Sequence, residues 1–499
     1  MKSNRRLPAM LLIALVAAAA IASAIGTGSH AAASGAAVRP LDDSAALVSA
    51  ASSPPSEAAC NAIGRRCFAP AAMANAYNYA GLHAAGHNGQ GITIAVVDSF
   101  GANTIRQDLA VFDTGFNLPH MCGEGNLPES SAGNCASGVP GPHFNIITIQ
   151  GDPEAKPTGG GNGTGQEDHS AWDTEVALDV EWAHATAPLA NIDLVTTPTA
   201  ETLGVQGLQQ MMNAEQSLID SHQVDVISQS FGAGEGSFHN GSAALNQLRQ
   251  TFVDAQANHV SVFASSGDGG TTNSMKEPVK NPATIPYQSV IWPASDPLVT
   301  ATGGTYLCVN GSTGLGIDNV SPPGGCHAWP GDREPGWVDS GGGYSTWFNR
   351  PAYQNVLPTG SSYVGSSPGA PGPNSQMRGV PDVSWESSAT TGPLIYSGEA
   401  GGWFVIGGTS AASPQWAGVA ALADEIAGHD LGFLNPALYA IGANPSQYAA
   451  DFYDPTHNSN QEPGSSIPGW PASQGWDAVT GLGTPNVANL IPDLIAHSN

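Results

Sequence analysis

Short apolar runs alternate with longer amphipathic segments along most of the chain. Four runs rich in β-branched residues have the length of buried strands: ITIAVVD ending at Asp98, NIDLVTT at 191–197, VDVISQS at 224–230 and VSVFASS at 260–266. Helical patterns at 173–186, 203–221 and 242–258 lie between them. This alternation predicts an α/β fold with a largely parallel central sheet and helices on both faces. Sites in such folds lie beyond the carboxyl ends of the strands.

The ends and the long loops follow a different pattern. A basic MKSNRR followed by the apolar LLIALVAAAAIASA predicts a signal peptide over 1–26, and hence a secreted protein, with an uncleaved membrane anchor as the alternative. Residues 27–66 lack apolar periodicity and are expected to form a short prosegment or a disordered tail. The globular domain is expected over 67–499, interrupted by Gly/Pro/Ser-rich loops at 118–170 and 355–377.

Charge and cysteine content narrow the class of protein. The chain has 14 Lys+Arg against 41 Asp+Glu, a net charge of −27, which argues against nucleic acid or an anionic membrane as a partner. The same balance suits an acidic medium, or simply solubility. The six cysteines fall in three close pairs that predict disulfides, with a zinc site as the rival interpretation: Cys60 with Cys67, Cys122 with Cys135, and Cys308 with Cys326.

The stretch VIGGTSAASPQWAG places Ser410 between a glycine turn and a predicted long helix. Amides at such a junction can bind an anion, so Ser410 is a candidate nucleophile that needs a base. A Ser-His-Asp triad could use Asp98, but no histidine has the flanking residues of such a triad, and His169 in EDHSAWD comes nearest. Asp98 is therefore interpreted as a turn or cap residue at a strand end.

A carboxylate base is the other possibility. Glu175 and Asp179 stand four residues apart in a predicted helix, so their side chains share one face. Like charges at that spacing repel, which raises the pKa of at least one carboxyl group. Taken alone, the pair could equally be a solvated acidic face.

Eight segments, in order, resemble the sedolisins, the serine-carboxyl peptidases with a subtilisin-like fold. They are EVALDVEWAHATAP from Glu175, SQSFGAGE (228–235), ASSGDGG (264–270), WPASDPLVTATGGT (292–305), GGGYSTWFNRPAYQ (341–354), RGVPDVS (378–384), GGTSAASP around Ser410 and GWDAVTGLGTP (475–485). The resemblance implies a subtilisin-like three-layer fold. It also implies Ser410 as nucleophile, Glu175 as general base and Asp179 as its support. Asp268 is implied in the oxyanion hole.

These roles imply acidic working conditions. An aspartate donates a hydrogen bond to an oxyanion only while it is protonated, and a glutamate base with a reference pKa of about 4.3 works best in acid. The simpler interpretation of Asp268 is a turn residue between two glycines.

The resemblance also implies a calcium site. Its ligands would be the carboxylates of Asp454 and Asp477 and the backbone carbonyls of Pro455, Ser473 and Gly475.

Two positions depart from the family pattern at that site. Pro455 replaces a branched aliphatic residue, and Asn458 replaces a glycine and could alter the turn of the loop. Two aspartates in polar loops are the alternative interpretation. The segment before CFAPAAMANAYN (67–78), where the resemblance places the mature start, is also too short for the folded propeptide typical of sedolisins.

The sequence predicts a secreted, monomeric, acid-active endopeptidase that acts on proteins or peptides and binds Ca²⁺. One alternative is a neutral subtilisin-type hydrolase that uses Asp98, a histidine and Ser410. The other is a non-catalytic member of the fold that binds peptides.

Overall fold

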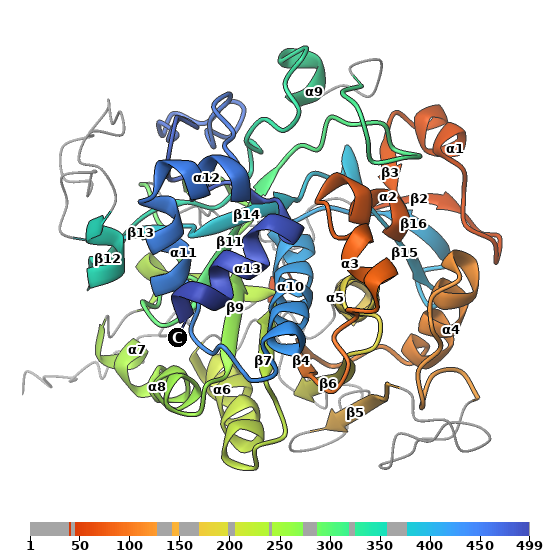
Figure 1. The fold of residues 1–499 in the computed structure, drawn as a ribbon, viewed down its shortest axis with the longest axis horizontal. Helices are drawn as coiled ribbons and strands as arrows, with labels where there is room; N and C mark the ends of the chain where they lie inside the picture. The colour runs from red at the N-terminus through yellow and green to blue at the C-terminus, as the bar shows by residue number, and fades with distance from the viewer. Residues whose placement is uncertain are drawn as a thin grey trace, which may run out of the picture. The chain divides into compact units, whose positions relative to one another are not determined.

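Seven parallel strands form the central sheet, in the order β14-β11-β9-β7-β4-β6-β5 (Figure 1). The computed structural model describes residues 39–40, 45–126, 142–148, 169–197, 205–238, 242–272, 287–318, 325–356 and 377–498. The strands are β4 (Thr93–Ser99), β5 (Phe144–Thr148), β6 (Asn191–Thr197), β7 (Val226–Gln229), β9 (Ser261–Ser265), β11 (Thr300–Thr305) and β14 (Val383–Glu386). The predicted parallel sheet is confirmed, and β4, β6, β7 and β9 arise from the four predicted runs.

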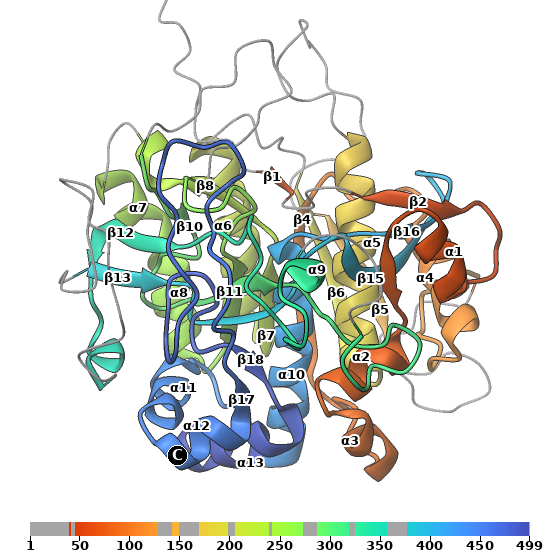
Figure 2. The ribbon, with the colours of Figure 1, turned by 90° about the horizontal axis from the view of Figure 1, so that it is seen from above.

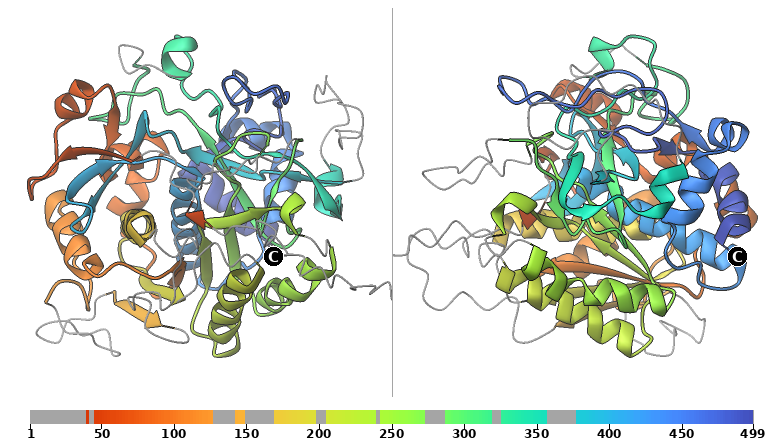
Figure 3. Two further views of the ribbon diagram at one scale, coloured as in Figure 1. Left: turned by 180° about the vertical axis from the view of Figure 1, so that it is seen from behind. Right: turned by 90° about the vertical axis from the view of Figure 1, so that its left-hand side faces the viewer.

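Helices cover both faces of this sheet. On one face lie α5 (His169–Thr186) and α10 (Ala412–Ala427), side by side in Figures 1 and 2. On the other lie α6 (Val205–Asp220), α7 (Ser242–Leu248) and α8 (Gln250–Ala257); in both views of Figure 3 these yellow-green and green helices lie together below the sheet. The helical pattern predicted over 242–258 forms two helices, because a turn at Arg249 interrupts the helix.

The middle of β4 shows why these strands contain consecutive apolar residues. Ile94 and Val96 pack in the core that contains α5 and α10, while Ala95 and Val97 pack in the core with α6 and α8. Successive side chains of a strand point to opposite faces, so a sheet covered on both faces needs apolar residues at every position. The helices α5 and α10 come close at Gly418, where a Cβ would lie 2.6 Å from that of Thr186.

Two smaller sheets contain strands from the N-terminal part of the chain. One has the order β2-β16-β15-β3 and consists of β2 (Ala46–Ser49), β16 (Gly402–Val405), β15 (Thr391–Ser397) and β3 (Arg66–Phe68). The other joins β1 (Arg39–Pro40), β8 (Phe231–Gly234) and β10 (Ile291–Trp292) in antiparallel pairs. With α1 (Glu57–Ala62) and β2, residues 45–66 pack on later parts of the chain. The expected disordered tail is therefore wrong for these residues.

The remaining elements surround this framework. They are α2 (Pro70–Ala76), α3 (Ala80–Ala85), α4 (Ile105–Phe116), η2 (Glu235–Ser237), α9 (Gly325–Ala328), β12 (Gly343–Asn349), η3 (Ala352–Val356), β13 (Met377–Val380), η4 (Thr409–Ala411), α11 (Asn435–Gly442), α12 (Pro445–Asp451), β17 (Phe452–Tyr453), β18 (Thr484–Pro485) and α13 (Val487–Ser498).

Two of the three predicted disulfides, Cys60–Cys67 and Cys308–Cys326, are present. The third includes Cys135, which lies outside the described residues, as does the predicted signal peptide. Among the described helices, none combines the length and the hydropathy needed to span a bilayer.

Candidate active site

Ser410 lies in η4, at the junction between a glycine turn and α10. Gly408 has a φ of 123°, a conformation that residues with a Cβ rarely adopt. Gly407 lies against another chain segment, since a Cβ there would be 2.1 Å from the amide nitrogen of Ala389. The turn therefore requires both glycines. Ser410 is fully buried, and its Oγ makes no hydrogen bond to the described residues.

Asp268 is linked directly to the residue before Ser410. The backbone N–H and the hydroxyl of Thr409 both donate to Oδ1 of Asp268, at 2.7 and 2.8 Å. The N–H of Gly267 donates to the same Thr409 hydroxyl at 3.0 Å. These bonds fasten the segment after β9 to η4. Because Oδ1 accepts twice, a proton on this acid belongs on Oδ2. Asp268 is thus held in place by Thr409, and its role in the oxyanion hole stays a prediction.

Glu175 and Asp179 lie in the interior and not on a solvated face. Every residue of α5 from 172 to 186 is buried, and both carboxyl groups have 0% exposure. The helix packs against η4 and α10. Oδ1 of Asp179 accepts a hydrogen bond of 2.9 Å from the hydroxyl of Ser230, which follows β7. Two acids buried in this way are costly to ionise together. The arrangement therefore suits two carboxyl groups that share a proton better than two carboxylates exposed to water.

Ser230 is a site residue that the sequence reasoning did not single out. It lies in the segment SQSFGAGE, and its position just past the carboxyl end of β7 could have identified it as a site residue. The structure thus collects polar groups at the carboxyl ends of neighbouring strands: Asp98 in β4, Ser230 after β7 and Asp268 after β9. Helix α5 supplies Asp179, which contacts Ser230.

Asp98 is a buried strand residue, so its interpretation as a turn or cap residue is wrong. It lies within β4, opposite Thr196 of β6, with 0% exposure. Burial raises the pKa of Asp98 to about 8. A neutral acid cannot support an imidazolium as the aspartate of a triad does. The contacts found for the described histidines do not include Asp98 or Ser410 either. The side chain of His169 lies outside the described residues.

The predicted calcium ligands come together on two loops near the C-terminus. The N–H of Gly475 donates to Oδ2 of Asp454 at 2.9 Å, and the N–H of Ser473 donates to Oδ2 of Asp477 at 2.8 Å. Oδ1 of Asp454 is buried, and burial raises the pKa of this carboxyl group although Gly475 and the hydroxyl of Tyr448 donate to it. Pro455 follows Asp454 in the chain. Burial raises the pKa of Asp477 to about 7, and the neighbouring Asp454 contributes to this shift. A hard cation would neutralise these two buried carboxylates, so these residues fit calcium.

The departure at Asn458 leaves the turn intact. Asn458 has a φ of 82°, in the left-handed region that glycine prefers and that asparagine tolerates better than most residues. Its Nδ2 also donates to the carbonyl of Gly336 at 2.8 Å. The concern that this substitution alters the loop is therefore not borne out by the backbone.

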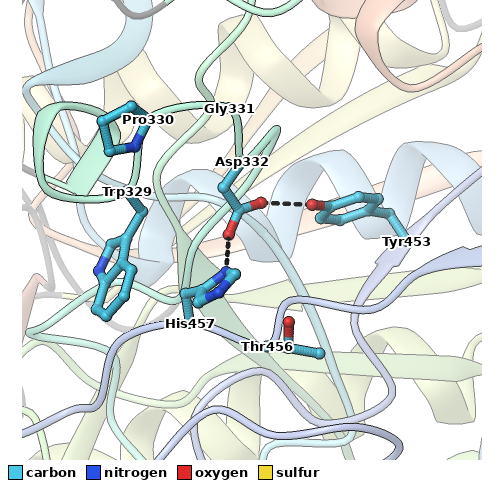
Figure 4. A pocket seen from close by; sticks show the side chains of 7 residues that line it. All are labelled: Trp329, Pro330, Gly331, Asp332, Tyr453, Thr456 and His457. Carbon is cyan, nitrogen blue, oxygen red and sulfur yellow. Dashed lines mark hydrogen bonds and ion pairs between the residues drawn. The ribbon is translucent and has the colours of Figure 1, made fainter.

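A pocket of about 430 Å³ borders the same loop (Figure 4). Asp332 accepts hydrogen bonds there from the hydroxyl of Tyr453 and, at 2.6 Å, from Nδ1 of His457. The ring of His457 stacks on Trp329, with centroids 4.8 Å apart. None of the predicted catalytic residues lines this pocket. Its contacts hold the loop that carries Asp454 on the segment around Asp332.

Comparisons with known proteins give the following similarities. The model of the subtilase family matches residues 89–437. Kumamolisin from a Bacillus species is 30% identical over 372 residues, covering 72% of this chain and 56% of that protein. Tripeptidyl-peptidase sed4 from Aspergillus fumigatus is 30% identical over 353 residues, covering 63% and 53%. The chain thus spans about half the length of these curated relatives.

A solved structure is similar in fold. Pseudomonas sedolisin, a serine-carboxyl proteinase complexed with two molecules of pseudo-iodotyrostatin, superposes with a TM-score of 0.62 at 24% identity. The superposition covers 87% of this chain and 100% of that one.

Proposed function

This chain belongs to the subtilase family, in its sedolisin branch, and from this premise we propose that it is a secreted serine-carboxyl endopeptidase active in acid. The observation that supports the proposal is the pair of hydrogen bonds to Asp268 from Thr409, the residue that precedes the candidate nucleophile in the chain. The buried carboxyl groups of α5, packed against the same turn, add the base.

The proposed reaction follows from these positions. Glu175 takes the hydroxyl proton of Ser410 while Oγ attacks the carbonyl carbon of the substrate. Asp179 orients Glu175 and shares the proton that Glu175 has taken. Protonated Asp268 donates a hydrogen bond to the oxygen that becomes negative. Glu175 then returns the proton to the leaving amine, which breaks the peptide bond and leaves an ester on Ser410. Water hydrolyses this ester by the same steps.

Burial of the surrounding acids supports work at low pH. Asp98 is neutral below its raised pKa of about 8, so it adds no negative charge near the carboxyl ends of the strands in acid. A protonated Asp268 and a partly ionised Glu175 are both available only where the medium is acidic. The absence of a described histidine contact at Ser410 speaks against the neutral subtilisin-type alternative.

We propose that Ca²⁺ binds between the two C-terminal loops, through the carboxylates of Asp454 and Asp477 and the carbonyls of Pro455, Ser473 and Gly475. When bound, the ion would supply charge neutralisation and hold the loops together. Asp477 also accepts hydrogen bonds from the N–H groups of Val479 and Thr480, at 2.8 and 2.9 Å, which orient its carboxylate.

The N-terminal segment bears on maturation. Strand β1 pairs with β8 directly after Ser230, with Arg39 opposite Gly232 and Pro40 opposite Phe231, and it contacts α5. A strand in this position blocks approach of another extended chain to the same edge. This supports a short prosegment that must leave before substrate binds.

The test is the pH dependence of cleavage of a denatured protein by the purified, calcium-supplied chain, with Ser410→Ala as the inactive control. A maximum well below neutrality supports the carboxylate base. A maximum at neutral or alkaline pH overturns it in favour of a histidine base. No cleavage at any pH, in protein whose N-terminus has been trimmed past Pro40, favours the peptide-binding alternative. Products from internal sites distinguish an endopeptidase from an enzyme that releases tripeptides, as the name of one relative suggests.

A further inference from the structure

A second cluster of possible metal ligands lies where α4 ends. Asp113 belongs to the last turn of α4, and His120 and Glu124 belong to the loop that follows. One side-chain ligand atom of each lies within 4.8 Å of the other two. This cluster shares no residue with the candidate active site or with the calcium loops. It also differs from the calcium loops chemically, because it includes an imidazole.

Glu124 is held in a fixed orientation towards the other two residues. Its Oε2 accepts the N–H of Met121 at 2.7 Å, while Oε1 contacts Nδ1 of His120. The Glu124 side chain is 1% exposed and that of His120 is 48% exposed. The cluster is therefore buried on its carboxylate side and open to solvent on its imidazole side, which gives an ion a way in.

Asp113 is a buried acid that lies next to a second buried acid. It has 0% exposure, and the carboxyl group of Glu124 is hydrogen-bonded to it. The imidazole of His184 lies 3.2 Å from Oδ1, and its Nε2 also hydrogen-bonds to the carbonyl of Pro119 at 3.0 Å. Two buried carboxyl groups this close are costly to ionise together unless a positive charge compensates them.

The helix adds to this demand for positive charge. The last turn of α4 contains no basic residue, although the negative end of the helix dipole points there. Arg106, on the same helix, donates to the carbonyls of Gly123 and Phe144. These bonds, with that from the N–H of Gly125 to the carbonyl of Arg106 at 2.6 Å, hold the loop on the helix.

We propose that Asp113, His120 and Glu124 bind a divalent transition-metal ion, with zinc the best match. Imidazole nitrogen and carboxylate oxygen are both zinc ligands, whereas calcium takes six to eight oxygen ligands. Three protein ligands leave the fourth position of a tetrahedral ion to water. His184 belongs to the surroundings that orient Asp113.

The bound ion would join three parts of the chain. Asp113 lies in the last turn of α4, and the loop of 117–126 carries the other two ligands. His184 lies on α5, five residues after Asp179 and nine residues after Glu175. The site is structural, because none of its ligands contacts the candidate catalytic residues in the described bonds. Its effect should therefore be on stability and not on the chemical step.

The experiment uses the full chain at pH 7 in calcium-replete buffer, since metal ligands must be deprotonated. Zinc is titrated by equilibrium dialysis, and bound zinc is counted by mass spectrometry. We expect one zinc per chain in the parent. We expect at least tenfold weaker binding in His120→Ala and Glu124→Gln, and unchanged binding in His429→Ala, which removes an exposed imidazole on the loop after α10.

A second measurement is needed in case the Glu124→Gln variant, altered at a buried residue, does not fold. Because His120 is exposed, His120→Ala should fold, and added zinc should raise the melting temperature of the parent and of His429→Ala but not of His120→Ala. The variant Asp454→Asn should keep its zinc, which separates this site from the calcium loops. Zinc uptake that is absent, or equal in the parent and His120→Ala, overturns the proposal.

Discussion

The molecule holds two pairs of acidic side chains whose surroundings differ. Glu175 and Asp179 lie on one helix inside the fold, and Asp179 accepts its hydrogen bond from the hydroxyl of Ser230. Asp454 and Asp477 lie on two loops, and the shortest hydrogen bonds given for them come from backbone N–H groups. The hydroxyl of Thr480 donates to Asp477 at the longer distance of 3.3 Å. The first pair is presented by a rigid helix, and the second by chain segments that only tertiary contacts bring together.

This difference separates two uses of the same functional group. A hydroxyl can donate or accept, so the bond between Ser230 and Asp179 can reverse when a proton moves. A backbone N–H can only donate, and it stabilises the ionised carboxylate in one orientation. The helix pair therefore suits proton transfer, and the loop pair suits a cation. Four predictions test this contrast.

Glu175→Gln should have the largest effect. Glutamine keeps the shape but cannot accept the proton of Ser410, so kcat should fall by about 10³-fold. The variant Glu215→Gln, which alters a buried acid of α6, is the matched control and should keep its activity. The measurement is kcat and KM on a peptide substrate at the optimal pH. Near-parent activity in Glu175→Gln would show that the helix pair is not the base.

Asp268→Ala should lower kcat by about 10²–10³-fold, because one donor to the oxyanion is lost. Asp268→Asn keeps a donor that needs no proton and an acceptor for Thr409, so it should recover part of the activity. It should also extend activity to higher pH than in the parent. A pH–rate profile of both variants checks this, and equal losses in the two would indicate that Asp268 only holds the turn.

Removal of calcium should act on stability more than on chemistry. If the site is saturated at a hundredfold excess over Kd, a chelator should cost about 2.7 kcal/mol in the free energy of unfolding. Asp454→Asn should lose this response to chelator, while Glu175→Gln should retain it. Thermal unfolding with and without chelator gives both results. A parent that does not respond to chelator would contradict the assignment of the loop pair.

The fourth prediction concerns how pH affects stability through a single buried acid. Burial raises the pKa of Glu215 to about 8, whereas in the unfolded chain it is about 4.3. Between these values the folded state keeps a proton that the unfolded state has lost. Stability is therefore full below pH 4 and falls as the pH rises to about 8, by about 1.4 kcal/mol per pH unit for one such group.

Glu215→Gln tests this directly, because glutamine can still accept the hydrogen bond of 2.6 Å from Gln229. Urea unfolding between pH 4 and 8 should show a flatter decline for the variant than for the parent. This would separate the effect of burial alone from that of pairing two acids. A steeper decline in the variant would mean that Glu215 is ionised in the folded protein.

The local sequence pattern predicted those elements whose own residues show that they are buried. Strands β4, β6, β7 and β9 were predictable because both faces of the sheet are covered and their runs are apolar throughout. The short strand β2 was not predictable, because its pairing partner β16 lies some 350 residues later. The residues of β2 do not indicate which strand it pairs with. The break between α7 and α8 was missed for a similar reason, since both halves have helical patterns.

The sequence by itself determined the glycine turn before Ser410, the spacing of Glu175 and Asp179 on one helix face, and the order of segments that identifies the family. These depend on neighbouring residues or on ordered motifs, which a single chain displays. Only the tertiary structure decided that the helix pair is buried, that Ser230 supports Asp179, that Thr409 holds Asp268, and that Asp113, His120 and Glu124 form a cluster. Burial and hydrogen bonding between distant segments arise from packing, which the local pattern does not encode.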